Sequence, residues 1–117
     1  MTVTIYHNPR CSKSRQTLAL LEARGITPKV VEYLKHQPSA AELKSILMKL
    51  GIEPRELMRQ SEQLYVELGL QDRALSDDDL IGLMVANPIL IERPIVVTRK
   101  GVRVCRPKEK VQEILPG

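Results

Sequence analysis

Residues 2–15 run Thr2-Val3-Thr4-Ile5-Tyr6-His7-Asn8-Pro9-Arg10-Cys11-Ser12-Lys13-Ser14-Arg15, and this stretch decides the fold. The alternating run Thr2–Ile5 predicts a short β-strand, and the leucine spacing in Gln16–Ala23 predicts an amphipathic helix. Asn8 and Pro9 predict a turn between them, because a proline there stops the strand from continuing. Cys11 is therefore expected at a strand-to-helix turn, close to the helix N-terminus.

Cys11 has the surroundings of a reactive thiol. The N–H groups and the dipole at a helix N-terminus favour negative charge, and such a position can lower a thiol pKa from roughly 8.5 toward neutrality. Arg10, Lys13 and Arg15 add positive charge, and His7 would add more when protonated. The alternative is an inert thiol in a loop, but the cationic flanks favour a thiolate. The Cys-x-x-x-Arg spacing to Arg15 is too short for the phosphate loop of tyrosine-phosphatase-like enzymes.

The N-terminal part of the chain predicts a βαβ unit. A second strand is expected at Pro28–Leu34, after Gly25 has ended the first helix. A crossover through a helix joins parallel strands, so these two strands are expected to run in parallel.

A helical segment is expected next, at about residues 39–86. Ser39 and Glu42 form a capping-box pattern at its start. The predicted helices are Ala40–Leu50, ended by Gly51, and shorter ones at residues 53–59 and 63–68. The acidic run Ser76–Asp79 resembles a metal cluster, but consecutive helical residues diverge by roughly 100° and cannot converge on one ion. Helix capping is therefore expected there, and no metal site.

Strands return near the C-terminus. Ile95–Thr98 is β-branched and is predicted to pair with Val102–Cys105 across a turn at residues 99–101. Pro107 then opens a last helix. The order β-α-β, helices, β-β-α is that of an α/β protein with a mixed, thioredoxin-like sheet and an inserted helical segment. We expect one domain spanning residues 1–117.

Composition excludes several classes of protein. The chain has two cysteines and no basic-then-apolar leader, which argues against a disulfide scaffold and for the reducing cytoplasm. No apolar run is long enough to span a membrane. The net charge of +4 favours anionic partners. With three tyrosines and neither phenylalanine nor tryptophan, the chain lacks the stacking platforms of nucleic-acid binders, so nucleic acid is not an expected partner.

Four separated motifs carry a family resemblance: Ile5–Pro9 with Cys11, Arg55–Arg59, Asn87–Val97 and Cys105–Pro107. Together they resemble the glutaredoxin-coupled arsenate reductase family, the thioredoxin-like group that also contains the Spx regulators. The resemblance covers nearly the whole chain. It implies that Cys11 attacks arsenate or a similar oxyanion. It also implies that glutathione is a co-substrate with no bound cofactor, and that glutaredoxin completes reduction to arsenite.

By matching position, the resemblance implies that Arg59, Arg93 and Arg106 bind the oxyanion. Guanidinium groups suit this role because their planar forks donate to two oxygens at once. The alternative for each arginine is a solvated surface charge or an ion pair. Arg93 and Arg106 each precede a proline at a sheet end, which favours the functional role, whereas for Arg59 the two alternatives are balanced. Pro94 matches the proline that this fold places beside the nucleophile in the cis form.

The remaining candidates are supporting residues with open alternatives. His7 could stabilise or orient the Cys11 thiolate, or be an ordinary polar residue at a strand end. Ser12 and Ser14 are expected to cap the helix, with donation to the thiolate as the alternative. Ser14 also stands where a second cysteine would complete Cys-x-x-Cys, so no local disulfide can form. Cys105 is expected to be a small buried hydrophobe rather than a redox group.

Two other functions remain open. One is an Spx-like regulatory protein that contacts the transcription machinery; the fold and the basic pI motivate it. The other is a glutathione-dependent thiol reductase without arsenate activity.

Overall fold

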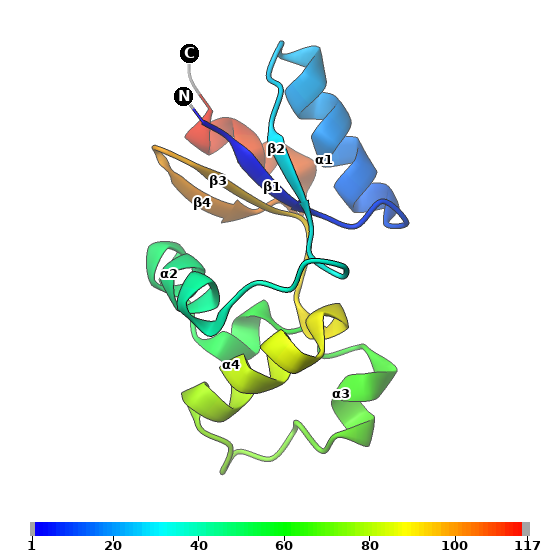
Figure 1. Ribbon diagram of the computed structural model, residues 1–117, viewed down its shortest axis with the longest axis vertical. Helices are drawn as coiled ribbons and strands as arrows, with labels where there is room; N and C mark the ends of the chain where they lie inside the picture. Colours follow the sequence, from blue (N-terminus) through cyan, green and yellow to red (C-terminus); the bar gives the residue numbers. More distant parts are fainter. Residues whose placement is uncertain (1, 116–117) are drawn as a thin grey trace. The chain divides into compact units, whose positions relative to one another are not determined.

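The computed structural model describes residues 2–115, which form two compact units (Figure 1). One, here called the sheet unit, comprises residues 2–36 and 93–115 of the described chain; the other, the helical unit, comprises residues 37–92. The helical unit corresponds to the predicted insertion and extends it by a few residues at each end. The assignment of the whole chain to a single domain stays a prediction.

The sheet unit is built on four strands in the order β2-β1-β3-β4. They are β1 (Thr4–His7), β2 (Lys29–Glu32), β3 (Ile95–Thr98) and β4 (Gly101–Val104). As predicted, β1 and β2 are parallel, with Ile5 opposite Val30. The other two pairs are antiparallel, with Ile5 opposite Val96. The sheet is therefore mixed, which confirms the predicted α/β class.

One core packs against this sheet. Helix α1 (Ser12–Ala23) and the 3₁₀ helix η3 (Lys108–Ile114) contact each other. The buried residues of this core come from the strands, from α1 and from the C-terminal segment: Val3, Ile5, Leu21, Val96, Cys105, Val111, Ile114 and Leu115. Because side chains alternate along an extended chain, Ile5 and His7 share the face of β1 that meets α1, and Val3, just before the strand, points the same way. This alternation places His7 at the carboxyl end of β1, beside the start of the helix.

The helical unit contains α2 (Ala40–Leu50), η1 (Pro54–Leu57), α3 (Gln63–Glu67), α4 (Asp77–Ala86) and η2 (Pro88–Leu90). Both predicted N-termini are confirmed as capping boxes, Ser39 with Glu42 and Ser76 with Asp79. Gly51 ends α2 in the left-handed conformation, with φ 69°, where a Cβ would be strained. The acidic run at Ser76 therefore caps a helix.

Several predicted boundaries were wrong. The first strand begins at Thr4 instead of Thr2, and α1 begins at Ser12 instead of Gln16. The last helix and the one predicted at residues 53–59 are 3₁₀ helices. The helix predicted at residues 53–59 stops at Leu57, because Met58 forms a β-bridge with Ile91. Among residues 2–115, no helix is long and apolar enough to cross a membrane.

Candidate active site

Cys11 is the N-cap residue of α1. Its backbone is extended, with φ −93° and ψ 121°, and its N–H donates to the carbonyl of Asn8 at 3.0 Å. The N–H of Arg15 in turn donates to the Cys11 carbonyl at 3.0 Å, which starts the helix. Cys11 is 9% exposed. The thiol therefore lies at the N-terminus of α1, where the N–H groups of the first helical turn can donate hydrogen bonds to it.

The environment of Cys11 favours the thiolate. Burial of the thiol is the largest influence and opposes ionisation. It is outweighed by a hydrogen bond from the Ser14 backbone, the charge of Arg93, a hydrogen bond from the Lys13 backbone and one from the Arg93 side chain. The pKa of Cys11 is consequently lowered from its ordinary value. The surroundings thus match those of a nucleophilic cysteine.

Ser14 connects Cys11 to the end of β1. Its side chain is fully buried and lies 2.6 Å from His7 Nδ1, and it accepts a hydrogen bond from the Asn8 N–H at 3.1 Å. The expectation that Ser12 and Ser14 cap the helix was wrong, because α1 has no side-chain cap. The Ser14 hydroxyl instead points inward, where it contacts the buried His7 ring and the N–H of the half-buried Asn8.

His7 is buried and contacts Ser14. It is 6% exposed, and burial, followed by the charge of Arg15, lowers its pKa against the raising effect of Glu32. His7 is therefore neutral at pH 7 and adds no positive charge to the site. Its contact with the Ser14 hydroxyl holds Ser14 in place, and the N–H group of Ser14 donates to the Cys11 sulfur.

Two of the three predicted arginines lie together in the sheet unit. The Arg93 guanidinium bonds to the Cys11 sulfur, and Arg106 Nη1 donates to the Arg93 carbonyl at 3.4 Å. The Arg93–Pro94 peptide bond is cis, as the resemblance implied, and so is Arg106–Pro107. The buried Pro94 accepts a hydrogen bond from the Cys105 N–H at 2.9 Å, which joins the two arginine-bearing segments.

The other two predicted cations have different surroundings. Arg15 is exposed and donates to the Pro9 carbonyl at 2.9 Å, so it braces the loop that carries Cys11. Arg59 belongs to the helical unit, where its guanidinium pairs with Glu62 at 3.1 Å.

Cys105 has the opposite character to Cys11. It is 1% exposed, and burial raises the pKa of its thiol to about 12. Its predicted place as a buried apolar residue is confirmed. Within residues 2–115, no three His, Cys, Asp or Glu side chains are grouped so as to hold a metal ion.

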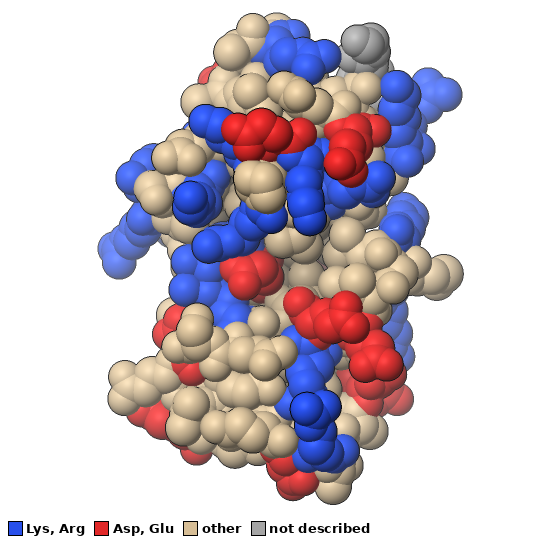
Figure 2. Space-filling model, turned by 180° about the vertical axis from the view of Figure 1, so that it is seen from behind, with Lys and Arg blue, Asp and Glu red and all other residues tan. Residues whose placement is uncertain are grey.

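Charge is divided unevenly along the chain. The sheet unit carries 13 Lys and Arg residues against 4 Asp and Glu, whereas the helical unit carries 5 against 10. The modest net charge of +4 therefore conceals a strongly basic unit that contains Cys11. Basic side chains spread over the upper part of the surface in Figure 2. Such a field attracts anions to the unit that contains Cys11.

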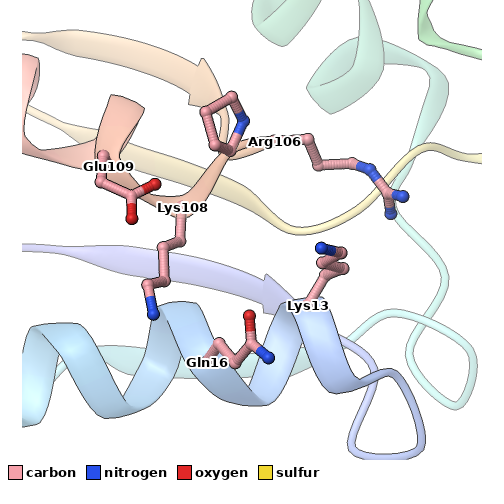
Figure 3. Close-up of a pocket in the computed structure, with 6 residues that line it drawn as sticks. Lys13, Gln16, Arg106, Lys108 and Glu109 are labelled. Atoms are coloured by element: carbon pink, nitrogen blue, oxygen red, sulfur yellow. The ribbon is translucent and has the colours of Figure 1, made fainter.

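An open cleft of about 460 Å³ lies between α1 and the segment that follows β4. Its lining residues are Lys13, Gln16, Arg106, Pro107, Lys108 and Glu109 (Figure 3). The sequence did not single out Gln16, Lys108 or Glu109 for any role. The basic run that begins at Arg106 was a partial signal, but the contact between α1 and η3 was needed to place it beside Lys13.

The sequence of this chain is similar to those of known proteins over nearly its whole length. Residues 6–114 match the ArsC family. An arsenate reductase from Rhizobium meliloti (strain 1021) is 51% identical over 116 residues, which are 99% of this chain and 83% of the relative. An uncharacterized protein, YfgD, from Escherichia coli (strain K12) is 55% identical over 114 residues, 97% of this chain and 96% of the relative.

A solved structure agrees with the fold. The arsenate reductase from Vibrio cholerae is 56% identical and superposes with a TM-score of 0.96, covering 98% of each chain. The resemblance drawn from the four sequence motifs is thereby confirmed.

Proposed function

This chain belongs to the ArsC family, and on that premise we propose that it is an arsenate reductase whose nucleophile is Cys11. The observation that carries the proposal is the lowered pKa of Cys11, held by the Ser14 and Lys13 N–H groups and by Arg93 in a basic unit. An ionised sulfur beside a bound guanidinium is what attack on an anionic substrate requires. The reducing cytoplasm is the expected compartment.

The first step forms a covalent adduct. The Cys11 thiolate attacks the arsenic of dihydrogen arsenate, an As–S bond forms, and one arsenic-bound oxygen takes up a proton and leaves as water. Arsenic stays in the +5 state. Arg93 and Arg106 hold the remaining oxygens and offset the charge that gathers on them. Arg93, bonded to the sulfur, brings nucleophile and substrate together.

Reduction then requires thiols from outside the chain. A glutathione thiol displaces a second oxygen as water and leaves arsenic bonded to both sulfurs. A glutaredoxin thiolate attacks the glutathione sulfur, so an S–S bond forms and the As–S bond to glutathione breaks. The electron pair stays on arsenic, which becomes +3, and water releases arsenite from Cys11. A second glutathione regenerates glutaredoxin.

The chain's own residues support this dependence on outside thiols. Ser14 holds the position of a resolving cysteine, and Cys105 is buried with a raised pKa. Neither can form a disulfide with Cys11 as it stands. The same absence of a second reactive thiol weighs against a redox-switch regulator of the Spx kind.

Arg59 stays the third predicted oxyanion ligand. In the helical unit its guanidinium is occupied by Glu62, so a role in binding needs an exchange of partners. Arg59→Lys keeps the charge and removes the fork. A raised KM for arsenate with an unchanged KM for glutathione would support the role, and unchanged kinetics would remove Arg59 from the site.

The decisive experiment measures arsenite formation from arsenate by the purified protein with glutathione and glutaredoxin. Wild type and Cys105→Ser are expected to be active and Cys11→Ser inactive. Iodoacetamide labelling of Cys11 should also be slowed by arsenate more than by sulfate. Full activity of Cys11→Ser would end the proposed mechanism. Reduction of glutathione mixed disulfides with no arsenite formed would identify a thiol reductase instead.

A further inference from the structure

We infer that the cleft between α1 and η3 binds glutathione and delivers its thiol to the adduct on Cys11. This inference rests on the proposed use of glutathione and assigns it a site. Lys13 connects this cleft with Cys11, because its backbone bonds to the Cys11 sulfur and its side chain lines the cleft. Arg106, also in the lining, contacts the Arg93 carbonyl.

The charges of the cleft match those of the tripeptide. Glutathione carries two carboxylates and one ammonium group, with the thiol between them. Lys13 and Lys108 supply two cations, Arg106 a third, and Glu109 one carboxylate. Within residues 2–115 no ion pair of Lys13, Lys108 or Glu109 is formed, so these charges are available to a ligand. The adjacent Lys108 and Glu109 suit the α-carboxylate and ammonium of the γ-glutamyl end.

The geometry of the lining supports the same orientation. In Figure 3 Lys13 and Gln16 rise from α1, while Lys108 reaches toward that helix from the opposite wall. The glycine carboxylate and its peptide group would meet Lys13 and Gln16, nearer to Cys11. A volume of about 460 Å³ falls in the ordinary range for sites that bind small molecules.

Binding is tested without chemistry by titrating the full chain with S-methylglutathione, whose thioether cannot react. Calorimetry should detect binding that Lys108→Gln weakens about fivefold, the loss expected for a single partly solvated ion pair. Lys110→Gln is the matched control, because it makes the same change in the same 3₁₀ helix outside the cleft. Equal weakening by both variants would show general attraction to basic charge and overturn the assignment.

Glu109→Gln gives a second readout. Wild type should prefer S-methylglutathione to the analogue that lacks the γ-glutamyl ammonium, and Glu109→Gln should lose that preference. If wild type reduces arsenate with 2-mercaptoethanol as the thiol but does not bind S-methylglutathione, the cleft assignment is wrong and the reductase stands. If S-methylglutathione binds as described but no arsenite forms with any thiol, the reductase is wrong and the glutathione site stands.

Discussion

Replacing Ser14 by alanine removes the hydroxyl that serves both the end of β1 and the loop before Cys11. The side chain is fully buried, so no water reaches the vacated position readily. His7 Nδ1 loses its contact at 2.6 Å, and the Asn8 N–H loses its acceptor at 3.1 Å. A buried polar group left without a partner costs about 1–3 kcal/mol. Asn8 is half-buried and regains part of this from solvent.

We therefore expect Ser14→Ala to lower the free energy of unfolding by about 2–3 kcal/mol. For a chain of this size the melting temperature should fall by roughly 8–12 °C. Urea unfolding followed by far-ultraviolet circular dichroism measures the loss, with the m-value expected to stay constant. Ser12→Ala is the matched control: the same change in the same helix turn, at an exposed position whose expected effect is within about 0.5 kcal/mol. Equal destabilisation by the two variants would refute the role given to the Ser14 hydroxyl.

Four further predictions concern single groups. Arg93→Gln removes a charge and a hydrogen bond from the thiolate, so the inflection in the pH profile of Cys11 alkylation should move to higher pH; an unmoved inflection would contradict the contact. Burial holds the pKa of His7 below 6.5, so the folded state takes up fewer protons than the unfolded state. Stability should fall as the pH drops below about 6.5, and His7→Asn should flatten that fall in urea titrations at several pH values. Native protein should incorporate one iodoacetamide label, and Cys105→Ala should leave that number unchanged while costing about 1 kcal/mol of stability. Ser76→Ala should cost about 1 kcal/mol by loss of the helix cap, measured by the same urea titration, and no loss would contradict the capping box.

Much of the fold could be predicted because its signals are local. The capping box at Ser39, the stop at Gly51 and the β-branched strand Ile95–Thr98 each depend on a few neighbouring residues, and the structure has them where they were expected. The start of α1 could not be placed in this way. Neither Ser12 nor Ser14 caps it through its hydroxyl, and a backbone hydrogen bond from the Cys11 N–H to the Asn8 carbonyl forms the turn that precedes it.

The missed features depend on contacts between distant parts of the sequence. The helix predicted to reach Arg59 stops early because Met58 pairs with Ile91, and the Arg59 N–H donates to the Leu90 carbonyl at 2.7 Å. The candidate site likewise contains one feature that could be predicted from neighbouring residues and one that could not. Cys11 was identifiable from its own neighbours, whereas the inward turn of the Ser14 hydroxyl follows from the face on which β1 presents His7.

The serine at position 14 and the burial of Cys105 have a consequence for how the protein reacts with oxidants. A protein with a vicinal dithiol can store two oxidising equivalents within itself and wait for a reductase. This chain has no such reservoir, so any oxidation of Cys11 that ends in a disulfide must join it to another molecule. Its redox state therefore follows the abundance of diffusible thiols around it, and thiol depletion should trap it as a mixed disulfide or a covalent dimer.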